Sequence, residues 1–331
     1  MNTALELQHV TKRFGSHIAV DDISFRVPTG VVFGVLGPNG AGKSTTLRMI
    51  NDVLAPDEGR IQLFGALAPG LAAARRIGYL PEERGLYAKM IVLEMVQFMG
   101  ELRGLTRADA RQRAGTWLER LGLGKWAKHR VQDLSKGMQQ KVQFATALIH
   151  EPELLILDEP WSGLDPINAD VLRNIVEEAR AAGRTVLFST HLMEQAEKVC
   201  DAVCIIARGR KIVDDSLVDL RRAAAERGRI ALEFEDDEGR ARAEAGPLAD
   251  PALVASRAGG GDPTLPALIV ELAEGISGNA LLAALLKLPV TLRRFEVVTP
   301  TLHQIFVDRV GAEGATAEPR EAGADENGGP R

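Results

Sequence analysis

The sequence contains few cysteines, few aromatic residues and no long apolar run. Its two cysteines, Cys200 and Cys204, exclude a framework of several disulfides, and they lack the nearby cysteine or histidine pairs of a zinc site. No stretch approaches the ~18 consecutive apolar residues of a membrane-spanning helix. The first residues also lack the charged and apolar regions of a secretion signal. We therefore expect a cytoplasmic chain that does not itself cross a membrane.

Neither acidic nor basic residues are in large excess. The 45 acidic residues outnumber the 40 basic ones, which gives a net charge of −5. This balance argues against binding nucleic acid or an anionic membrane through overall charge, and we expect no nucleic-acid partner. The length of 331 residues allows two domains, since domains typically have roughly 100–200 residues.

The hydrophobic pattern predicts an α/β domain over residues 1–225. Short β-rich segments are expected at 5–10, 23–27 and 31–36, followed by a helix at 45–54. Residues 94–149 have helical spacing, and we expect a helical insert over about 88–150. Apolar strands at 154–157, 185–188 and 202–206 then alternate with helices at 169–182 and 192–199. This alternation is typical of a parallel sheet covered on both faces.

The composition changes after Leu220, and we expect a small α+β accessory domain over residues 229–310. Its predicted strands are 230–234, 265–272 and 290–298, and its predicted helices are 279–288 and 301–310. A glycine run at 259–261 is expected to form a loop. Residues 311–331 are rich in glycine, alanine and glutamate without apolar periodicity, which predicts a disordered tail.

A phosphate-binding motif lies between the strand at 31–36 and the helix at 45–54. Its pattern is G-x-x-x-x-G-K-[ST], in which backbone N–H groups bind phosphates, the lysine reaches the β- and γ-phosphates, and the hydroxyl binds Mg²⁺. The start of the helix, at Thr45, adds its positive dipole end. The residues of the motif are Gly37, Pro38, Asn39, Gly40, Ala41, Gly42, Lys43 and Ser44.

Ionisable residues follow two of the predicted strands. Asp158 and Glu159 come directly after the apolar run 154–157, and His191 follows the strand at 185–188. Ligands of open α/β sheets bind at the carboxyl ends of the strands, so these side chains are expected at one edge. A carboxylate such as Asp158 can hold the magnesium shell, and a second one such as Glu159 can orient water for hydrolysis. The sequence therefore predicts a Mg²⁺-dependent centre that binds and hydrolyses a phosphate-bearing nucleotide.

A third motif carries a family resemblance. The segment Leu134-Ser135-Lys136-Gly137-Met138-Gln139-Gln140-Lys141 is similar to the signature sequence of the ATP-binding subunits of ABC transporters. The order of the motifs also resembles that family, with Ser162-Gly163-Leu164-Asp165 as its D-loop. The resemblance covers about residues 3–220, and it implies a P-loop NTPase fold of ABC type with a helical subdomain.

The resemblance implies roles for several residues. Phe14 matches the aromatic residue that stacks on adenine, although a phenylalanine there is also compatible with an ordinary core position. Glu159 matches the catalytic carboxylate, with Lys43 and His191 near the γ-phosphate. Asp165 is expected in the nucleotide site. Ser135 and Gly137 would contact ATP bound to a second subunit.

One position departs from the family. Glu82 stands where the family usually has a glutamine, in the segment that links the core to the helical insert. A carboxylate can join the Mg²⁺ or water shell, but its charge differs from that of glutamine. We expect Glu82 in the nucleotide site and leave its role as a direct ligand open.

Further details are similar to one subfamily, the exporters related to sodium-extrusion and drug-resistance pumps. These are Lys136 and Met138 in the signature, the 79–87 segment, and a closing helix at 300–306. The resemblance implies an ATP-hydrolysing subunit, working as a dimer, with two identical subunits sufficient. It also implies a separate polytopic membrane subunit, on whose cytoplasmic side this chain would lie.

Two alternatives stay open from the sequence. The first is an ABC ATPase acting on ribosomes or nucleic acid, which the single phosphate loop and the absence of sustained heptads disfavour. The second concerns Met90, Met95 and Met99 in the helical insert, which are compatible with either a partner-facing surface or core packing.

Overall fold

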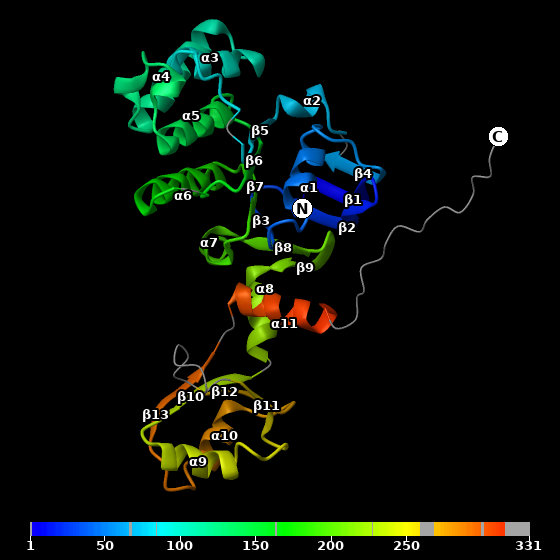
Figure 1. Ribbon diagram of the computed structural model, residues 1–331, viewed down its shortest axis with the longest axis vertical. Helices are drawn as coiled ribbons and strands as arrows, with labels where there is room; N and C mark the ends of the chain where they lie inside the picture. Colours follow the sequence, from blue (N-terminus) through cyan, green and yellow to red (C-terminus); the bar gives the residue numbers. More distant parts are fainter. Residues whose placement is uncertain are drawn as a thin grey trace, which may run out of the picture. The chain divides into compact units, whose positions relative to one another are not determined.

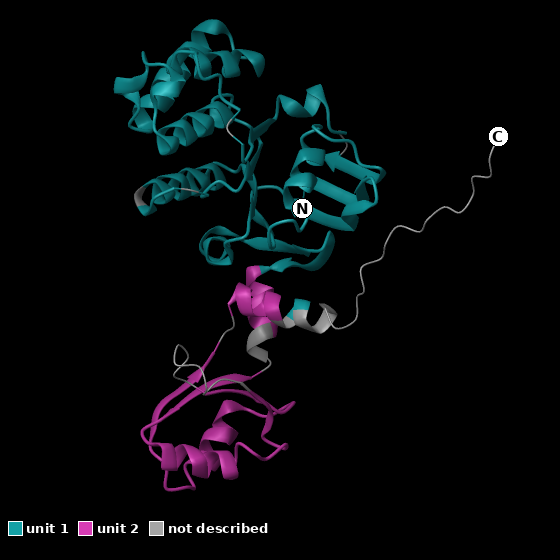
Figure 2. Ribbon diagram, viewed as in Figure 1, with its two compact units in different colours: residues 1–216, 309–331 teal, residues 217–308 magenta. Residues whose placement is uncertain are grey.

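The protein is described from a computed structural model. The described residues are 2–65, 68–83, 85–162, 164–226, 228–258, 268–298 and 301–314. The chain divides into two compact units, residues 1–216 with those from 309 onward, and residues 217–308 (Figure 2). This division comes earlier than the predicted boundary near 225–229. The composition changes only after Leu220, but the last strand of the first unit already ends at Ser216 and continues directly into a helix.

A six-stranded sheet forms the centre of the first unit (Figure 1). Its order is β5-β6-β7-β3-β8-β9, and all neighbours are parallel except β8 and β9. Every residue of β3, β6 and β7 is buried, as expected for a parallel sheet covered on both faces. The strands are β3 (Val32–Leu36), β5 (Ile77–Leu80), β6 (Leu154–Asp158), β7 (Thr185–Thr190), β8 (Ala202–Ala207) and β9 (Arg210–Ser216).

A second, three-stranded antiparallel sheet packs against this centre. It contains β1 (Thr3–Phe14), β2 (His17–Pro28) and β4 (Glu58–Leu63) in the order β2-β1-β4. The rings of Phe25 in β2 and Phe33 in β3 stack with their centroids 5.6 Å apart, within one continuous apolar core. The helices of this part are α1 (Lys43–Ile50), α2 (Leu71–Ala74), α6 (Pro166–Ala181) and α7 (Met193–Val199).

The predicted helical insert is present as a separate group of helices beyond β5 (Figure 1). It consists of α3 (Val92–Leu102), α4 (Arg107–Arg120), α5 (Lys136–Leu148) and two short 3₁₀ helices, η1 (Gly124–Trp126) and η2 (Val131–Asp133). The end of α5 lies so close to β5 that a Cβ on Gly78 would be 2.1 Å from the carbonyl oxygen of Ala147. The sheet, the phosphate-loop topology and the insert confirm the predicted P-loop NTPase fold of ABC type.

The second unit contains a four-stranded antiparallel sheet in the order β11-β12-β10-β13. The chain runs β-α-β-β-α-β with two interleaved crossovers, which is the ferredoxin-like topology. Apolar residues of α9 and α10 share one core with alternate residues of β10 and β12, so both helices cover the same face. The elements are β10 (Arg229–Phe234), α9 (Asp237–Ala245), β11 (Val254–Ala258), β12 (Leu268–Leu272), α10 (Gly278–Leu285) and β13 (Leu292–Val297).

Two further helices flank this sheet in the sequence, α8 (Leu217–Glu226) and α11 (Leu302–Gly314). The structure extends α11 to Gly314, whereas the sequence predicted a disordered tail from Gly311. Ala312 and Glu313 favour a helix whereas Gly311 and Gly314 oppose it, so helix propensity alone does not explain the extension. The rest of the predicted tail, 315–331, and the glycine run 259–261 lie outside the described residues.

None of the helices described is both long enough and apolar enough to span a membrane.

Candidate functional site

The phosphate-binding motif forms a tight loop between β3 and α1. Gly37 and Gly42 have φ angles of 151° and 102°, a region that favours glycine. Added Cβ atoms would lie 2.0 Å from the carbonyl oxygen of Ile206 and 2.4 Å from that of Ala19. Both glycines are therefore required by backbone conformation and by close packing. The first N–H groups of α1 at the end of this loop form a ready anion-binding site.

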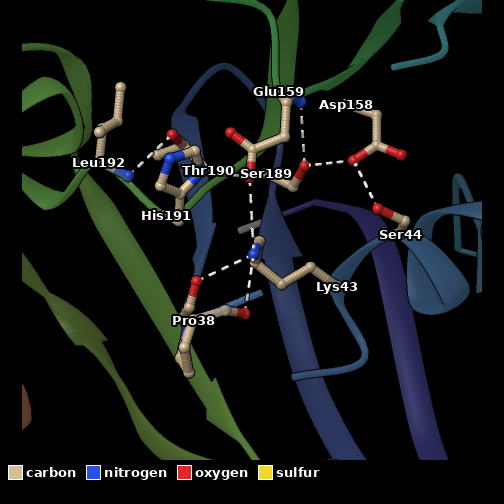
Figure 3. Close-up of polar contacts among 10 residues, drawn as sticks. Pro38, Lys43, Ser44, Asp158, Glu159, Ser189, Thr190, His191 and Leu192 are labelled. Carbon is tan, nitrogen blue, oxygen red and sulfur yellow. Dashed lines mark hydrogen bonds and ion pairs between the residues drawn. The ribbon is translucent and has the colours of Figure 1, made fainter. Parts of the chain in front are cut away.

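Lys43 is the first residue of α1 and lies almost entirely inside the protein, with 6% of its surface exposed. Its Nζ donates to the carbonyl oxygens of Gly37 (2.9 Å) and Pro38 (3.1 Å) and lies 3.5 Å from Oε1 of Glu159 (Figure 3). A buried ammonium requires such partners. The loop thus holds the lysine against the carboxylate at the end of β6.

Asp158 ends β6 and is buried next to the loop. Its Oδ1 accepts hydrogen bonds from the hydroxyls of Ser44 (3.1 Å) and Ser189 (2.5 Å). Its Oδ2 is also buried and has no hydrogen-bond partner within the described part of the chain. Burial, the largest cause, raises the pKa of this carboxyl. Carboxylate and hydroxyl oxygens are the ligands that Mg²⁺ prefers, so the unpaired oxygen beside Ser44 fits a magnesium ion.

Glu159 follows Asp158 in a left-handed conformation with φ of 47°. Such strain typically costs of order 1–3 kcal/mol and is common at functional sites. The backbone N–H of Glu159 donates to the hydroxyl of Ser189 at 3.1 Å, so Ser189 contacts both acidic residues (Figure 3). Oε1 of Glu159 lies 3.0 Å from Nδ1 of His191. The carboxylate is therefore held between Lys43 and His191.

These residues surround one cavity of about 520 Å³. Most of the predicted site residues line it, while Gly37, Pro38 and Asp158 do not, although Lys43 and Ser44 contact them. The lining residues are Phe14, His17, Ala19, Asn39, Gly40, Ala41, Gly42, Lys43, Ser44, Thr45, Glu82, Glu159, Ser162 and His191.

Phe14 lies at the rim of the cavity rather than in the core. It is 47% exposed, and Nζ of Lys12 lies 5.7 Å from the centre of its ring. This exposure rules out the alternative that Phe14 is an ordinary core residue. His17, which sequence reasoning did not assign to the site, pairs with Phe14 across the β1–β2 hairpin and also lines the cavity. The hairpin register was the signal that could have identified it.

Glu82 reaches the cavity from the neighbouring strand. It follows β5, which pairs in parallel with β6, so the carboxyl ends of both strands meet at one edge. Tyr79 within β5 is largely buried, and burial, reinforced by the charge of Asp158, raises its pKa to about 12. The phenol therefore stays neutral beside the carboxylates.

Three further predicted site residues also do not line this cavity. Ser135 is exposed and caps α5, where its hydroxyl accepts the N–H of Met138 at 3.3 Å. Gly137 is half-buried, and a Cβ added to it would lie 3.7 Å from Nδ2 of Asn168, an ordinary van der Waals distance. Asp165 caps α6 and accepts the N–H of Asn168 at 2.9 Å. The structure thus separates the signature and the D-loop aspartate from the cavity of the same chain, and Gly163 lies outside the described residues.

The methionines of the insert do not form one exposed face. Met95 is fully buried, while Met90 and Met99 are half-buried. The partner-facing interpretation is therefore wrong for Met95, because this side of α3 packs into the core of the insert.

Two further residues near the site were not identified from the sequence. Ser189, in an apolar strand, is fully buried between the two carboxyl-bearing residues. Trp161 packs edge-on against Phe188 with ring centroids 4.8 Å apart. Ser189 lies near the end of β7, two residues before His191, and belongs to no motif. A polar side chain within a buried apolar strand was the only signal that could have indicated a role.

Comparisons with known proteins agree with this geometry. The ABC transporter family matches residues 20–162. The uncharacterized ABC transporter ATP-binding protein YhaQ of Bacillus subtilis is 38% identical over 309 residues, covering 93% of this chain and 99% of that protein. The Nod factor export ATP-binding protein I of Cupriavidus metallidurans is 39% identical over 216 residues, covering 65% of this chain and 71% of that protein.

Solved structures give the same result. A structure of an ATP-binding subunit of an ABC transporter is 32% identical with a TM-score of 0.61, covering 66% of this chain and 92% of that one. The motifs, the fold and the similarity over nearly the full chain lead to one assignment. The chain belongs to the ATP-binding proteins of ABC transporters and is an ATPase of that family.

Proposed function

We propose that this chain binds ATP with Mg²⁺ and hydrolyses it to drive export through a separate membrane subunit. The observation that supports this most strongly is the arrangement at the end of β6. A buried carboxylate with an unpaired oxygen lies beside Ser44, and the next residue, Glu159, projects into the cavity between Lys43 and His191.

The cavity assigns each residue a task in binding. Phe14 stacks on the adenine, and the loop from Gly37 to Thr45 surrounds the phosphates with N–H groups. Lys43 exchanges its contact with Glu159 for the β- and γ-phosphates. Ser44, Asp158 and Glu82 are the residues that would supply oxygen atoms to Mg²⁺ and its water shell. The ion, when bound, neutralises charge on the phosphate oxygens.

Hydrolysis then uses Glu159 and His191. Once Lys43 contacts the phosphates, the carboxylate of Glu159 is free to orient a water molecule and accept its proton as the water attacks the γ-phosphorus. The bond from the γ-phosphorus to the bridging oxygen breaks, and ADP and phosphate leave. His191, within 3.0 Å of Glu159, holds the carboxylate and contacts the γ-phosphate.

Each site is completed by a second copy of the chain. Ser135, which is exposed, and Gly137, which is half-buried, lie outside the cavity. In a head-to-tail dimer, their N–H and hydroxyl groups at the start of α5 would bind the γ-phosphate of the other copy's ATP. Binding of ATP favours this closed dimer, and hydrolysis releases it. Because one chain carries both halves of the site, two identical copies suffice.

Export and a membrane location follow from the relatives. One relative of this chain is named as a Nod factor export protein, and the described helices include no membrane span. We infer that a polytopic membrane subunit provides the pathway and that this chain lies against its cytoplasmic side. The group of helices α3–α5 is the surface we assign to that contact.

Co-purification tests this proposal. The chain would be tagged at its chromosomal locus, extracted from native membranes in mild detergent and analysed by mass spectrometry. A polytopic membrane protein in stoichiometric amount is the expected result. Ribosomal proteins or nucleic acid without a membrane partner would instead support an ABC ATPase that acts on ribosomes or nucleic acid.

A further inference from the structure

Helix α5 contacts both loops that carry acidic residues of the cavity. Nε2 of Gln140 donates to the carbonyl oxygen of Pro160 at 2.6 Å, directly after Glu159. Nε2 of Gln143, one turn along the helix, donates to the carbonyl oxygen of Glu83 at 3.3 Å, directly after Glu82. Both glutamines are buried, with 7% and 5% of their surfaces exposed. A buried amide is retained at little cost only where it is hydrogen-bonded.

The loop after β6 needs such anchors because Glu159 is strained. Its left-handed backbone is held on the side of β7 by Ser189, which accepts the N–H of Glu159. Trp161 also contacts β7 through the ring of Phe188. The hydrogen bond from Gln140 comes from α5 in the helical insert, not from the sheet. Glu159 therefore lies between an anchor in the sheet and an anchor in α5.

We propose that Gln140 is a positioning residue, which holds the Glu159 loop in its hydrolytic geometry and ties that geometry to the placement of α5. This rests on the hydrolytic role proposed for Glu159. Gln140 does not line the cavity and so has no contact with ATP in its own chain. Its effect passes through Pro160 to the carboxylate.

The link has a direct consequence for the dimer. Ser135 caps the same helix that carries Gln140 about one and a half turns later. A 13-residue helix moves as one body over this short distance. Seating the start of α5 on the other copy's nucleotide therefore also sets the position of Glu159 in the same chain.

The test compares Gln140→Met, which keeps the volume but removes the donor, with Gln97→Met. Gln97 is a matched control in the insert, because it is equally buried, with 7% of its surface exposed, and its amide donates to Glu101 within α3. In the full-length protein we expect kcat for ATP hydrolysis to fall about ten- to a hundredfold in Gln140→Met, with KM within about threefold. Gln97→Met should stay within about threefold of wild type in both.

A second measurement separates positioning from folding. In the Glu159→Gln background, Gln140→Met should form the ATP-dependent dimer at the same ATP concentration as Glu159→Gln alone, because closure does not use the Glu159 carboxylate. Unchanged kcat in a folded Gln140→Met protein would overturn the proposal, as would a loss of ATP-driven dimerisation in the double variant. A wild-type chain that neither hydrolyses ATP nor dimerises would instead contradict the proposed function itself.

Discussion

The cavity and the start of α5, which carries the signature residues, differ in how many contacts their polar groups make within one chain. At the cavity, the loop, Asp158, Glu159 and His191 hold one another through short contacts, and Lys43, Asp158 and Glu159 are buried. At the start of α5, Ser135 is exposed and Gly137 is half-buried. Under the function proposed above, the cavity binds the chain's own nucleotide and the start of α5 binds the nucleotide of a second copy.

Because of this difference, ATP binding and ATP hydrolysis should respond differently to substitution. Removing a catalytic group from the cavity should lower the rate of hydrolysis, whereas altering the start of α5 should leave ATP binding by the single chain intact. Four substitutions test this comparison.

The largest effect is expected for Glu159→Gln. The amide keeps the shape of the side chain but cannot accept the proton of water, so kcat should fall by about 10²–10⁴-fold. ATP binding should persist, and size-exclusion chromatography with ATP should show a stable dimer. Full ATPase activity in this variant would show that another group acts as the base.

Gly137→Asp should come next. The chain accommodates the new side chain, because the nearest atom lies 3.7 Å from its Cβ. Its charge would face the phosphates bound to the second copy, and we expect kcat to fall about a hundredfold while the single chain's affinity for ATP changes less than about threefold. Gly115→Asp in α4, where no atom lies within 4 Å of an added Cβ, is the matched control and should retain activity. An equal loss of nucleotide affinity in Gly137→Asp would mean that the signature serves its own chain's cavity.

Ser189→Ala should have a smaller effect. It removes the hydroxyl that contacts both Asp158 and the N–H of Glu159, so we expect kcat to fall about tenfold and the free energy of unfolding to fall by about 1–2 kcal/mol. Thr190→Val removes the neighbouring buried hydroxyl, which contacts the N–H of Leu192 instead. Equal losses of kcat in the two variants would show that Ser189 has no special role.

The smallest effect concerns the other end of α5. His150 follows this helix, and its Nε2 donates to the carbonyl oxygen of Ile77 at 3.0 Å in β5. Burial, reinforced by Arg103, Arg184 and Arg113, lowers the pKa of His150 to about 4. The unfolded chain therefore binds a proton between about pH 6.5 and 4 that the folded chain does not, and stability falls as the pH falls through this range.

The matching variant is His150→Gln, which keeps a donor but does not titrate. Between pH 7.5 and 5, urea unfolding should show that wild type loses about 1–2 kcal/mol more stability than His150→Gln. Parallel loss in both proteins would assign the pH dependence to other groups.

The sequence predicted which residues gather at the cavity better than it predicted the strands around them. The buried strands β3, β6, β7 and β8 are short apolar runs, and motifs at their ends indicated Lys43, Asp158 and Glu159. The strand β5 was not predicted, because it has only four residues and includes Gly78, whose role is to let the end of α5 come close. The edge strand β9 was missed because polar residues dominate it and only Val213 is buried.

Anchoring residues were harder to predict than contacting ones. Ser189 and Gln140 form hydrogen bonds to backbone or carboxylate groups that are distant in the sequence. No periodicity or motif encodes such a pairing, since it depends on where the sheet places β6, β7 and α5. In the second unit, α9 and β11 were missed for a related reason, because α9 is mostly charged and only its small residues are buried.

The strand order of the central sheet also bears on how the chain is made. β3, which carries the phosphate loop, pairs with β7 and β8, so that Val32 lies opposite Val186. A growing chain that has left the ribosome only as far as the helical insert already contains the whole loop sequence but neither neighbour of its strand. Such long-range parallel pairing forms late. Nucleotide therefore stabilises the chain only after synthesis is complete and the sheet has formed, and it does not assist the early steps of folding.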